Sequence, residues 1–166
     1  LMEVRVAAAF IKQGVSPQKV RRAIQIARTL FGKDHPLSTM SFRMDGHSVF
    51  LQLSEEEGDD KLIDLFRQQY AFHEIIEPSL KHIEFDESGV PSRWFPCGRS
   101  ACIVIDPTRS FGHPIEAESG VPTAALAAAA RAEGGVEAAA KAWHVPVRSV
   151  RRAVEFEEAL QGRLAA

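Results

Sequence analysis

Near its carboxyl end the sequence reads Val145-Pro146-Val147-Arg148-Ser149-Val150-Arg151-Arg152-Ala153-Val154, and this stretch decides the fold of the second half of the chain. Proline is favoured at the start of a helix, where its missing N–H costs no hydrogen bond. The first valine is placed to fill the crease between two helices, and Val150 and Val154 recur at helical spacing and face a bundle. We therefore predict a helix over residues 146–160 with its paired arginines turned outward.

Two further helices are predicted before this one. Residues 123–132 are rich in alanine, Gly134-Gly135 interrupts them, and residues 136–143 have the pattern of a short helix. Ala139 stands where two closely crossing helices need a small side chain. A short helix, a turn and an exposed basic helix together predict a trihelical helix-turn-helix bundle.

Such a bundle suits a DNA major groove, where the first residues of the last helix meet base edges and its arginines meet guanine or phosphate. The DNA-facing candidates on a recognition helix over residues 146–156 are Arg148, Ser149, Arg151 and Arg152. Candidate phosphate contacts are Lys141 and His144. The alternative is a solvated face, neutralised at short range by Glu155, Glu157 and Glu158.

The front of the chain repeats the same local pattern. Val15-Ser16-Pro17-Gln18-Lys19-Val20-Arg21-Arg22-Ala23-Ile24 parallels the stretch above and also begins a helix just after a turn. Ser16 is a suitable N-cap, and Gly32 is placed to end the helix. The second set of DNA-facing candidates is Gln18, Lys19, Arg21 and Arg22. The alternative is a hairpin used only for packing or dimerisation.

Another helix precedes this segment, so the front is predicted to be a helical hairpin. The first helix has apolar residues at helical spacing at Leu1, Val4, Ala8 and Ile11. The second has an apolar stripe of Val20, Ile24, Ala27 and Leu30. Because the sequence starts inside the first helix, we expect an N-terminal part ahead of Leu1.

The central region is predicted to be small, antiparallel and of mixed β/α structure. Apolar and polar residues alternate from Met40 to Leu53 around Met44-Asp45-Gly46, which predicts a β-hairpin. Residues 55–70 predict a helix capped by Ser54. The side chains of that helix expected to point inward are Leu62, Leu65 and Phe66.

A second hairpin is expected from Ile83 to Phe95 around Glu87-Ser88-Gly89, and a short apolar strand from Ala101 to Ile105. The fold class is therefore α+β and mainly helical. We predict one domain over residues 1–96, the helical hairpin with the acidic α+β region, and a second over residues 97–166, the strand with the trihelical bundle.

Composition and charge narrow the class of protein. The 166 residues are 45% hydrophobic and 25% charged, which is typical of a soluble globular chain. No stretch approaches the ~20 apolar residues of a membrane helix and no secretion signal is seen, so we expect a cytoplasmic protein without membrane contact. Up to residue 33, seven basic residues oppose one acidic residue, whereas from residue 54 to 90 eleven acidic residues oppose three basic ones. The net positive charge of residues 1–33 favours contact with phosphate groups, and the net negative charge of residues 54–90 repels them.

No catalytic or metal-binding pattern is present, so we predict no enzyme activity, no metal site and no cofactor. The six histidines have no ligand spacing, and the acids at residues 55–60 lie at a helix start, where they favour the helix dipole without any ion. Phe111-Gly112-His113-Pro114 lacks the lysine and hydroxyl of a phosphate loop. Cys97 and Cys102 are expected to be buried, reduced thiols.

Three motifs in the last third of the chain carry a resemblance to a known family: Ile103-Val104-Ile105-Asp106-Pro107, Phe111-Gly112-His113-Pro114-Ile115, and Val121-Pro122 before the trihelical tail. With them the chain resembles the domain of unknown function number 433 family, whose members are similar to VapB-type antitoxins and are commonly encoded beside a PIN-like toxin nuclease. The resemblance implies an antitoxin that neutralises such a toxin and represses its own operon. The chain departs from the family at Glu116-Ala117-Glu118-Ser119-Gly120, which replaces a Gly-Thr-Arg turn.

The front also resembles the last helix pair of a MerR-like winged-helix domain, in which a Gly-x-Ser turn precedes a helix with a Val-Arg pair. Here these are Gly14-Val15-Ser16 and Val20-Arg21. The resemblance implies that the recognition helix and wing of such a domain precede Leu1.

Three functions stay open. The first is a homodimeric antitoxin that binds operator DNA and uses its acidic residues 54–90 to cover a basic nuclease cleft. The second is a protein-interaction or dimerisation module without DNA binding, which salt dependence would distinguish. The third is a MerR-like, ligand-responsive regulator with a pocket formed by Phe50, Phe72, Phe85 and Trp94, although such aromatics are more often ordinary core.

Overall fold

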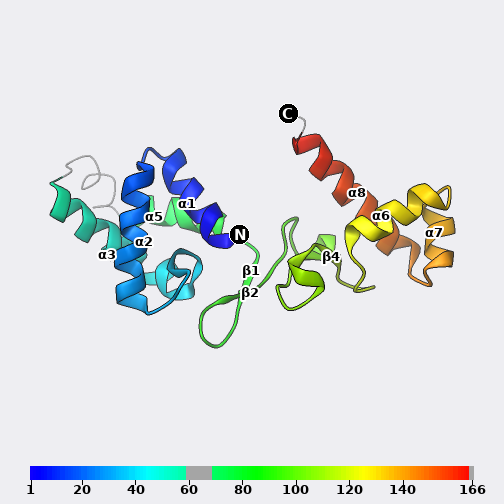
Figure 1. Cartoon of the computed structure of the whole chain (residues 1–166), viewed down its shortest axis with the longest axis horizontal. Helices are drawn as coiled ribbons and strands as arrows, with labels where there is room; N and C mark the ends of the chain where they lie inside the picture. The colour runs from blue at the N-terminus through cyan, green and yellow to red at the C-terminus, as the bar shows by residue number, and fades with distance from the viewer. Residues whose placement is uncertain (59–68, 165–166) are drawn as a thin grey trace. The chain divides into compact units, whose positions relative to one another are not determined.

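The computed structural model describes residues 1–58 and 69–164. Within them lie seven α-helices and two small two-stranded sheets, so the fold is mainly helical and of the α+β class, as predicted. The chain divides into two compact units (Figure 1): unit 1 comprises Leu1–Lys81 and Phe85–Pro91, and unit 2 comprises His82–Glu84 and Ser92–Ala166. None of the described helices is long and apolar enough to cross a membrane.

Unit 1 is built from helices in the part of the chain that the structure describes. They are α1 (Met2–Lys12), α2 (Pro17–Phe31), the 3-10 helix η1 (Pro36–Ser38), α3 (Met40–Glu57) and α5 (Gln69–Ser79). The ends of α2 are as predicted, because the side chain of Ser16 accepts a hydrogen bond from the backbone N–H of Lys19 and Gly32 takes the left-handed conformation at φ 62°.

Four phenylalanine rings fill the centre of unit 1. Phe10, Phe42, Phe50 and Phe72 are all fully buried. The ring centroids of Phe10 and Phe50 lie 4.4 Å apart, and those of Phe42 and Phe72 lie 5.6 Å apart. Aromatic pairs at these separations add to the stability that area burial provides. Phe50 and Phe72 therefore belong to the core that joins α1, α3 and α5.

The predicted β-hairpin from Met40 to Leu53 is wrong, because these residues form most of α3. Thr39 caps the helix by accepting a hydrogen bond from the Phe42 N–H. Phe42, Val49, Phe50 and Leu53 then fall on one buried face. Asp45-Gly46 is a turn signal locally, but Gly46 packs against the aromatic rings, where a Cβ would lie 2.7 Å from Phe42. Burial of the phenylalanines outweighs the local turn preference.

The helix predicted over residues 55–70 does not begin at Ser54. That residue lies inside α3, is fully buried, and its hydroxyl donates to the carbonyl of Phe50. α3 ends at Glu57, followed by Gly58 in the left-handed conformation. The rest of the predicted helix, with Leu62, Leu65 and Phe66, lies outside the described residues apart from its last two positions in α5.

The apolar stripe predicted for the first helix is wrong, and that predicted for the second is confirmed at Val20 and Ala27 but not at Leu30. In α1 the buried residues are Met2, Val6 and Phe10, while Leu1 is 76% and Val4 is 71% exposed. In α2 the buried residues are Val20, Ala23 and Ala27, and Leu30 is exposed. Both helices carry apolar residues on more than one face, and the packing of Phe10 into the aromatic core decides which face of α1 is buried.

The hairpin predicted around Glu87-Ser88-Gly89 is confirmed. Its strands are β1 (Ile83–Phe85) and β2 (Pro91–Trp94). Asp86 closes the turn, since its carboxylate accepts hydrogen bonds from the backbone N–H groups of Ser88 and Val90, each at 2.9 Å. These bonds, that from Val90 first, lower the pKa of Asp86.

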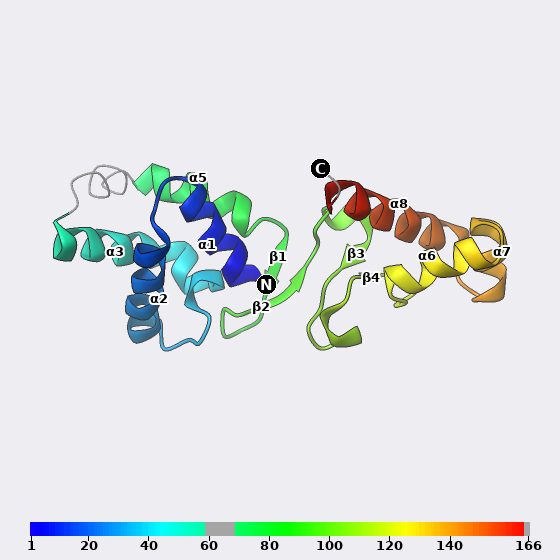
Figure 2. The same cartoon turned by 45° about the horizontal axis from the view of Figure 1, so that its top comes forward.

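Unit 2 continues with a small antiparallel sheet. After η2 (Arg99–Ala101), β3 (Ile103–Val104) pairs with β4 (Ile115–Glu116), Val104 lying opposite Ile115. β3 confirms the predicted apolar strand over a shorter range. The connecting loop contains η3 (Ser110–Gly112), and Figure 2 shows β4 leading toward α6.

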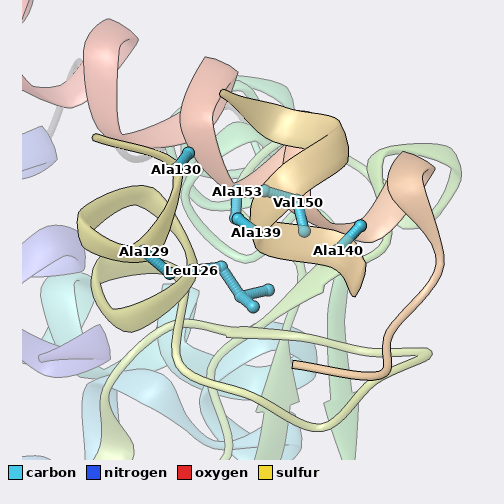
Figure 3. Packing of buried hydrophobic residues seen from close by; sticks show 7 residues of the cluster. All are labelled: Leu126, Ala129, Ala130, Ala139, Ala140, Val150 and Ala153. Carbon is cyan, nitrogen blue, oxygen red and sulfur yellow. The ribbon is translucent and has the colours of Figure 1, made fainter. Parts of the chain in front are cut away.

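The predicted trihelical bundle is present as α6 (Thr123–Ala132), α7 (Val136–Ala142) and α8 (Val147–Leu164). Its core consists of Leu126, Ala129, Ala130, Ala139, Ala140, Val150 and Ala153 (Figure 3). Most of these side chains are alanine, so the helices approach closely. Ala139 and Val150 are fully buried, as their predicted packing roles require.

Candidate nucleic-acid interface

The basic side chains predicted to contact DNA gather around the turn between α7 and α8. His144 takes a left-handed backbone conformation at φ 53° in this turn, which lets the chain reverse from α7 into α8. Lys141 and His144 are exposed. The side chains of Arg148 and Arg151 are 65% and 59% exposed, that of Arg152 is 29% exposed, and Ser149 is fully buried.

Two carboxylates, Glu116 at the end of β4 and Glu118 in the following turn, hold two of these arginines, a contact that the sequence did not predict. Arg148 makes a two-pronged ion pair with Glu118, in which its Nε lies 2.8 Å from Oε2 and its Nη2 contacts Oε1. The Nη1 atom of Arg152 lies 3.1 Å from Glu116 Oε1 and 3.3 Å from Glu118 Oε2. We call these four residues the acid–arginine clamp.

Glu116 is the buried member of the clamp, with 0% of its side chain exposed. Burial raises its pKa, but hydrogen bonds from Ser119, whose backbone N–H lies 2.8 Å from Oε2, and from Arg152 outweigh burial, so the net pKa is lowered. The pKa of Glu118 is lowered chiefly by Arg148, whose own pKa is raised in return. Both carboxylates are therefore charged at neutral pH.

Arg151 has a different environment. Its Nη2 lies 3.6 Å from Glu137 Oε1 of α7, and both side chains are mostly exposed. Exposed pairs of this kind contribute only about 0–1 kcal/mol because water and salt screen them. Arg151 therefore yields to a competing phosphate more readily than Arg152, which is held by two carboxylates.

Of the three glutamates expected to neutralise these arginines from within α8, Glu157 has a different partner. Glu157 accepts a hydrogen bond from the hydroxyl of Thr123 at the start of α6. The carboxylates that pair with the arginines come instead from β4, the following turn and α7. The arginines of α8 thus form their ion pairs with segments that are distant in sequence.

The second candidate set lies in the first turns of α2. Gln18, Arg21 and Arg22 are exposed, and Lys19 is half-buried. The two segments of similar sequence also pack in a similar way: Val20 and Ala23 of α2 are buried, and so are Val150 and Ala153 of α8. The repeated sequence therefore reflects a repeated packing solution.

No protein-family model matches the chain. It is 29% identical over 164 residues to a curated Mycobacterium tuberculosis protein named "Putative antitoxin VapB45", a match that covers 93% of this chain and 68% of that protein. The chain is a homologue of VapB45. This agrees with the predicted resemblance to antitoxins of the VapB type.

A solved structure supports the same relationship. The X-ray crystal structure of Rv2018 from Mycobacterium tuberculosis matches with a TM-score of 0.68 and 29% sequence identity, over 90% of this chain and 73% of that chain. The similarity to known proteins therefore extends from sequence to fold, and it covers most of the chain rather than the last third alone.

Two other predictions concern reactive groups. Among the described residues, no three His, Cys, Asp or Glu side chains lie together as a group able to hold a metal ion. Cys97 and Cys102 are free, but the expectation that they are buried is wrong, since Cys97 is exposed and Cys102 is half-buried. Both fall near loops and 3-10 turns rather than in the helical cores.

Proposed function

We propose that the chain is the antitoxin of a toxin–antitoxin pair and that it represses its own operon by binding operator DNA through α8. Homology to VapB45 supports the antitoxin assignment. The observation that carries the DNA-binding part is the α7–turn–α8 arrangement, which presents Lys141, His144, Arg148 and Arg151 at one turn of a trihelical bundle. This placement resembles that of a recognition helix and its supporting helix, which supports the proposal.

Exposure and ion pairing support some of the candidate residues more strongly than others. Arg151 and Lys141 are exposed and suited to phosphate or base edges, and Arg148 is exposed but engaged by Glu118. Ser149 is fully buried and supports α8 from beneath, whereas Arg152 is half-buried and paired with both Glu116 and Glu118, so it is less available to DNA than Arg151. Because two-fold operators are read by dimers, we propose that the protein acts as a homodimer.

Equilibrium binding to duplex DNA from the promoter of its own gene tests the proposal. Each phosphate contact contributes about 0.9 to the slope of log K against log salt concentration. Arg151→Ala should weaken binding and reduce that slope by about one contact. The matched control is Arg131→Ala, which removes an exposed arginine at the end of α6. Binding by wild-type protein that is insensitive to salt, or equal effects of the two variants, would contradict the DNA-binding role of α8.

A cognate toxin is implied by the antitoxin assignment, and we propose a PIN-like nuclease on the basis of the resemblance to the 433 family. The acidic segment 54–90 is our candidate for covering a basic cleft of that enzyme. Glu55, Glu74 and Glu87 of this segment are exposed, whereas Glu77 pairs with Arg43 at 2.6 Å. Reversing the charge of the three exposed residues should abolish co-purification with the toxin, while Glu155→Lys on α8 should not.

A second candidate function is an interaction module that does not bind DNA. Leu1, Val4 and Ile11 form an exposed apolar stripe on α1, which favours contact with another protein. Binding through this stripe would respond little to salt, so the salt series above separates the two functions.

A further inference from the structure

The acid–arginine clamp occupies the same side chains that a recognition helix offers to DNA. Arg148 is the second residue of α8 and Arg152 follows one turn later, so both lie on one face of the helix. Glu118 reaches both guanidinium groups, with its Oε2 atom 2.8 Å from Arg148 Nε and 3.3 Å from Arg152 Nη1. A single carboxylate thus bridges two arginines.

The two acids of the clamp differ in how easily they can be displaced. Glu116 is fully buried and belongs to the fold, since its carboxylate also accepts the backbone N–H of Ser119. Glu118 is 34% exposed and sits at the outer edge of the turn. Only Glu118 can leave the arginines without opening the core of unit 2.

A guanidinium group binds phosphate with the same two-pronged geometry that it uses for a carboxylate. We propose that Glu118 is an intramolecular competitor of DNA phosphate for Arg148 and Arg152, so that DNA binding exchanges the Glu118 carboxylate for a backbone phosphate. The inference rests on the proposed function of α8. It adds that the affinity for DNA is held below the value that the arginines alone would give.

Replacement of the competitor should therefore strengthen binding. Glu118→Gln keeps the size of the side chain and removes its charge, and the control Glu155→Gln makes the same change at an exposed position of α8. We expect Glu118→Gln to raise the affinity for promoter duplex roughly 5- to 30-fold at low salt, because one or two arginines become free to contact phosphate. The slope of log K against log salt concentration should become steeper. Glu155→Gln should change affinity much less.

A double-mutant cycle assigns the effect to the clamp. In an Arg148→Ala background, Glu118→Gln should lose most of its benefit, because Arg148 makes the two-pronged pair with Glu118 whereas Arg152 makes a single contact at 3.3 Å. Fluorescence anisotropy with labelled duplex measures affinity, and circular dichroism verifies that each variant is folded. Glu118→Ala provides a second folded variant with the same expected direction.

The outcomes separate this inference from the proposed function. If wild-type protein binds DNA and Glu118→Gln binds no more tightly than Glu155→Gln, the competitor role is refuted while DNA binding stands. Phosphate contacts are strong at a salt concentration of about 50 mM. If neither the wild type nor any variant binds DNA there, both the DNA-binding function and the competitor role are refuted.

Discussion

Glu116 offers the sharpest test of how unit 2 is held together, through the substitution Glu116→Gln. The carboxylate is fully buried and accepts hydrogen bonds from Ser119 and from Arg152, the latter at 3.1 Å. Glutamine keeps one acceptor oxygen but removes the charge and places an N–H₂ group where a second acceptor stood. Leaving a buried donor without its acceptor costs about 1–3 kcal/mol.

The partial exposure of Arg152 sets the expected value within that range. Breaking a fully buried ion pair costs about 3–5 kcal/mol, but Arg152 is 29% exposed and retains Glu118 at 3.3 Å. We therefore expect Glu116→Gln to lower the free energy of unfolding of unit 2 by about 2 kcal/mol at pH 7. Glu118→Gln is the control, because the ion pairs of Glu118 are exposed to solvent and contribute little to the stability of the fold.

Intrinsic fluorescence provides an assay confined to unit 2. The chain has two tryptophans, Trp94 and Trp143, and both belong to that unit. Urea unfolding followed by their emission thus reports unit 2 without a contribution from unit 1. Substitutions at the surface usually change the free energy of unfolding by no more than about 0.5 kcal/mol. If Glu116→Gln lowers the free energy of unfolding of unit 2 by no more than this, a structural role for the buried carboxylate is refuted.

The pH dependence supplies an independent measurement of the same group. The folded-state pKa of Glu116 lies below its ordinary value of 4.5. The stabilisation by the carboxylate is therefore fully present above pH 4.5 and is lost as the pH falls through the lower folded-state pKa. The difference in stability between wild type and Glu116→Gln should shrink below pH 4.5 and remain constant between pH 6 and 8.

Two further substitutions test backbone strain and aromatic packing. The side chain of Phe111 is 100% exposed, and its backbone has a φ of 54°, which favours glycine. Phe111→Gly should therefore raise the stability of unit 2 by up to about 1 kcal/mol, whereas Phe111→Ala, which keeps a Cβ, should not. Urea unfolding followed by tryptophan emission compares the two variants. Gly46→Ala gains about 1 kcal/mol in helix propensity, but its Cβ meets the buried rings of Phe42 and Phe72 at 2.7 and 2.8 Å. Overpacking costs about 1–3 kcal/mol, so thermal unfolding monitored by far-ultraviolet circular dichroism should show a net loss in unit 1.

The parts of the fold that were predicted correctly are those that local rules determine. Ser16 and Gly32 delimit α2, and the acid-rich turn before Val90 forms the second hairpin, because caps and turns depend on residues only a few positions apart. Gly134-Gly135 likewise separates α6 from α7. These elements need no knowledge of the tertiary structure.

The errors arose where distant packing overrode a local signal. Asp45-Gly46 has the composition of a hairpin turn, but Gly46 is required by rings contributed from α3 itself and from α5. In α1 the residues Leu1 and Val4 follow the helical period as well as Val6 and Phe10 do, and periodicity alone does not say which stripe meets a partner. Only the arrangement of the four phenylalanines decides between them.

The candidate interface shows the same division between packing and electrostatics. The parallel segments of α2 and α8 bury equivalent valines and alanines, so apolar spacing fixes how each helix lies on its neighbours. The charge of the α8 face depends instead on Glu116 and Glu118, which are at least thirty residues away in sequence from the arginines that they hold. No periodicity rule reports a contact over that separation, although two acids in one turn and two arginines one helical turn apart form a matching pair. In the folded unit the two carboxylates thus neutralise Arg148 and Arg152 at the basic start of α8. We propose that the affinity of this helix for DNA depends on how readily Glu118 releases the two arginines.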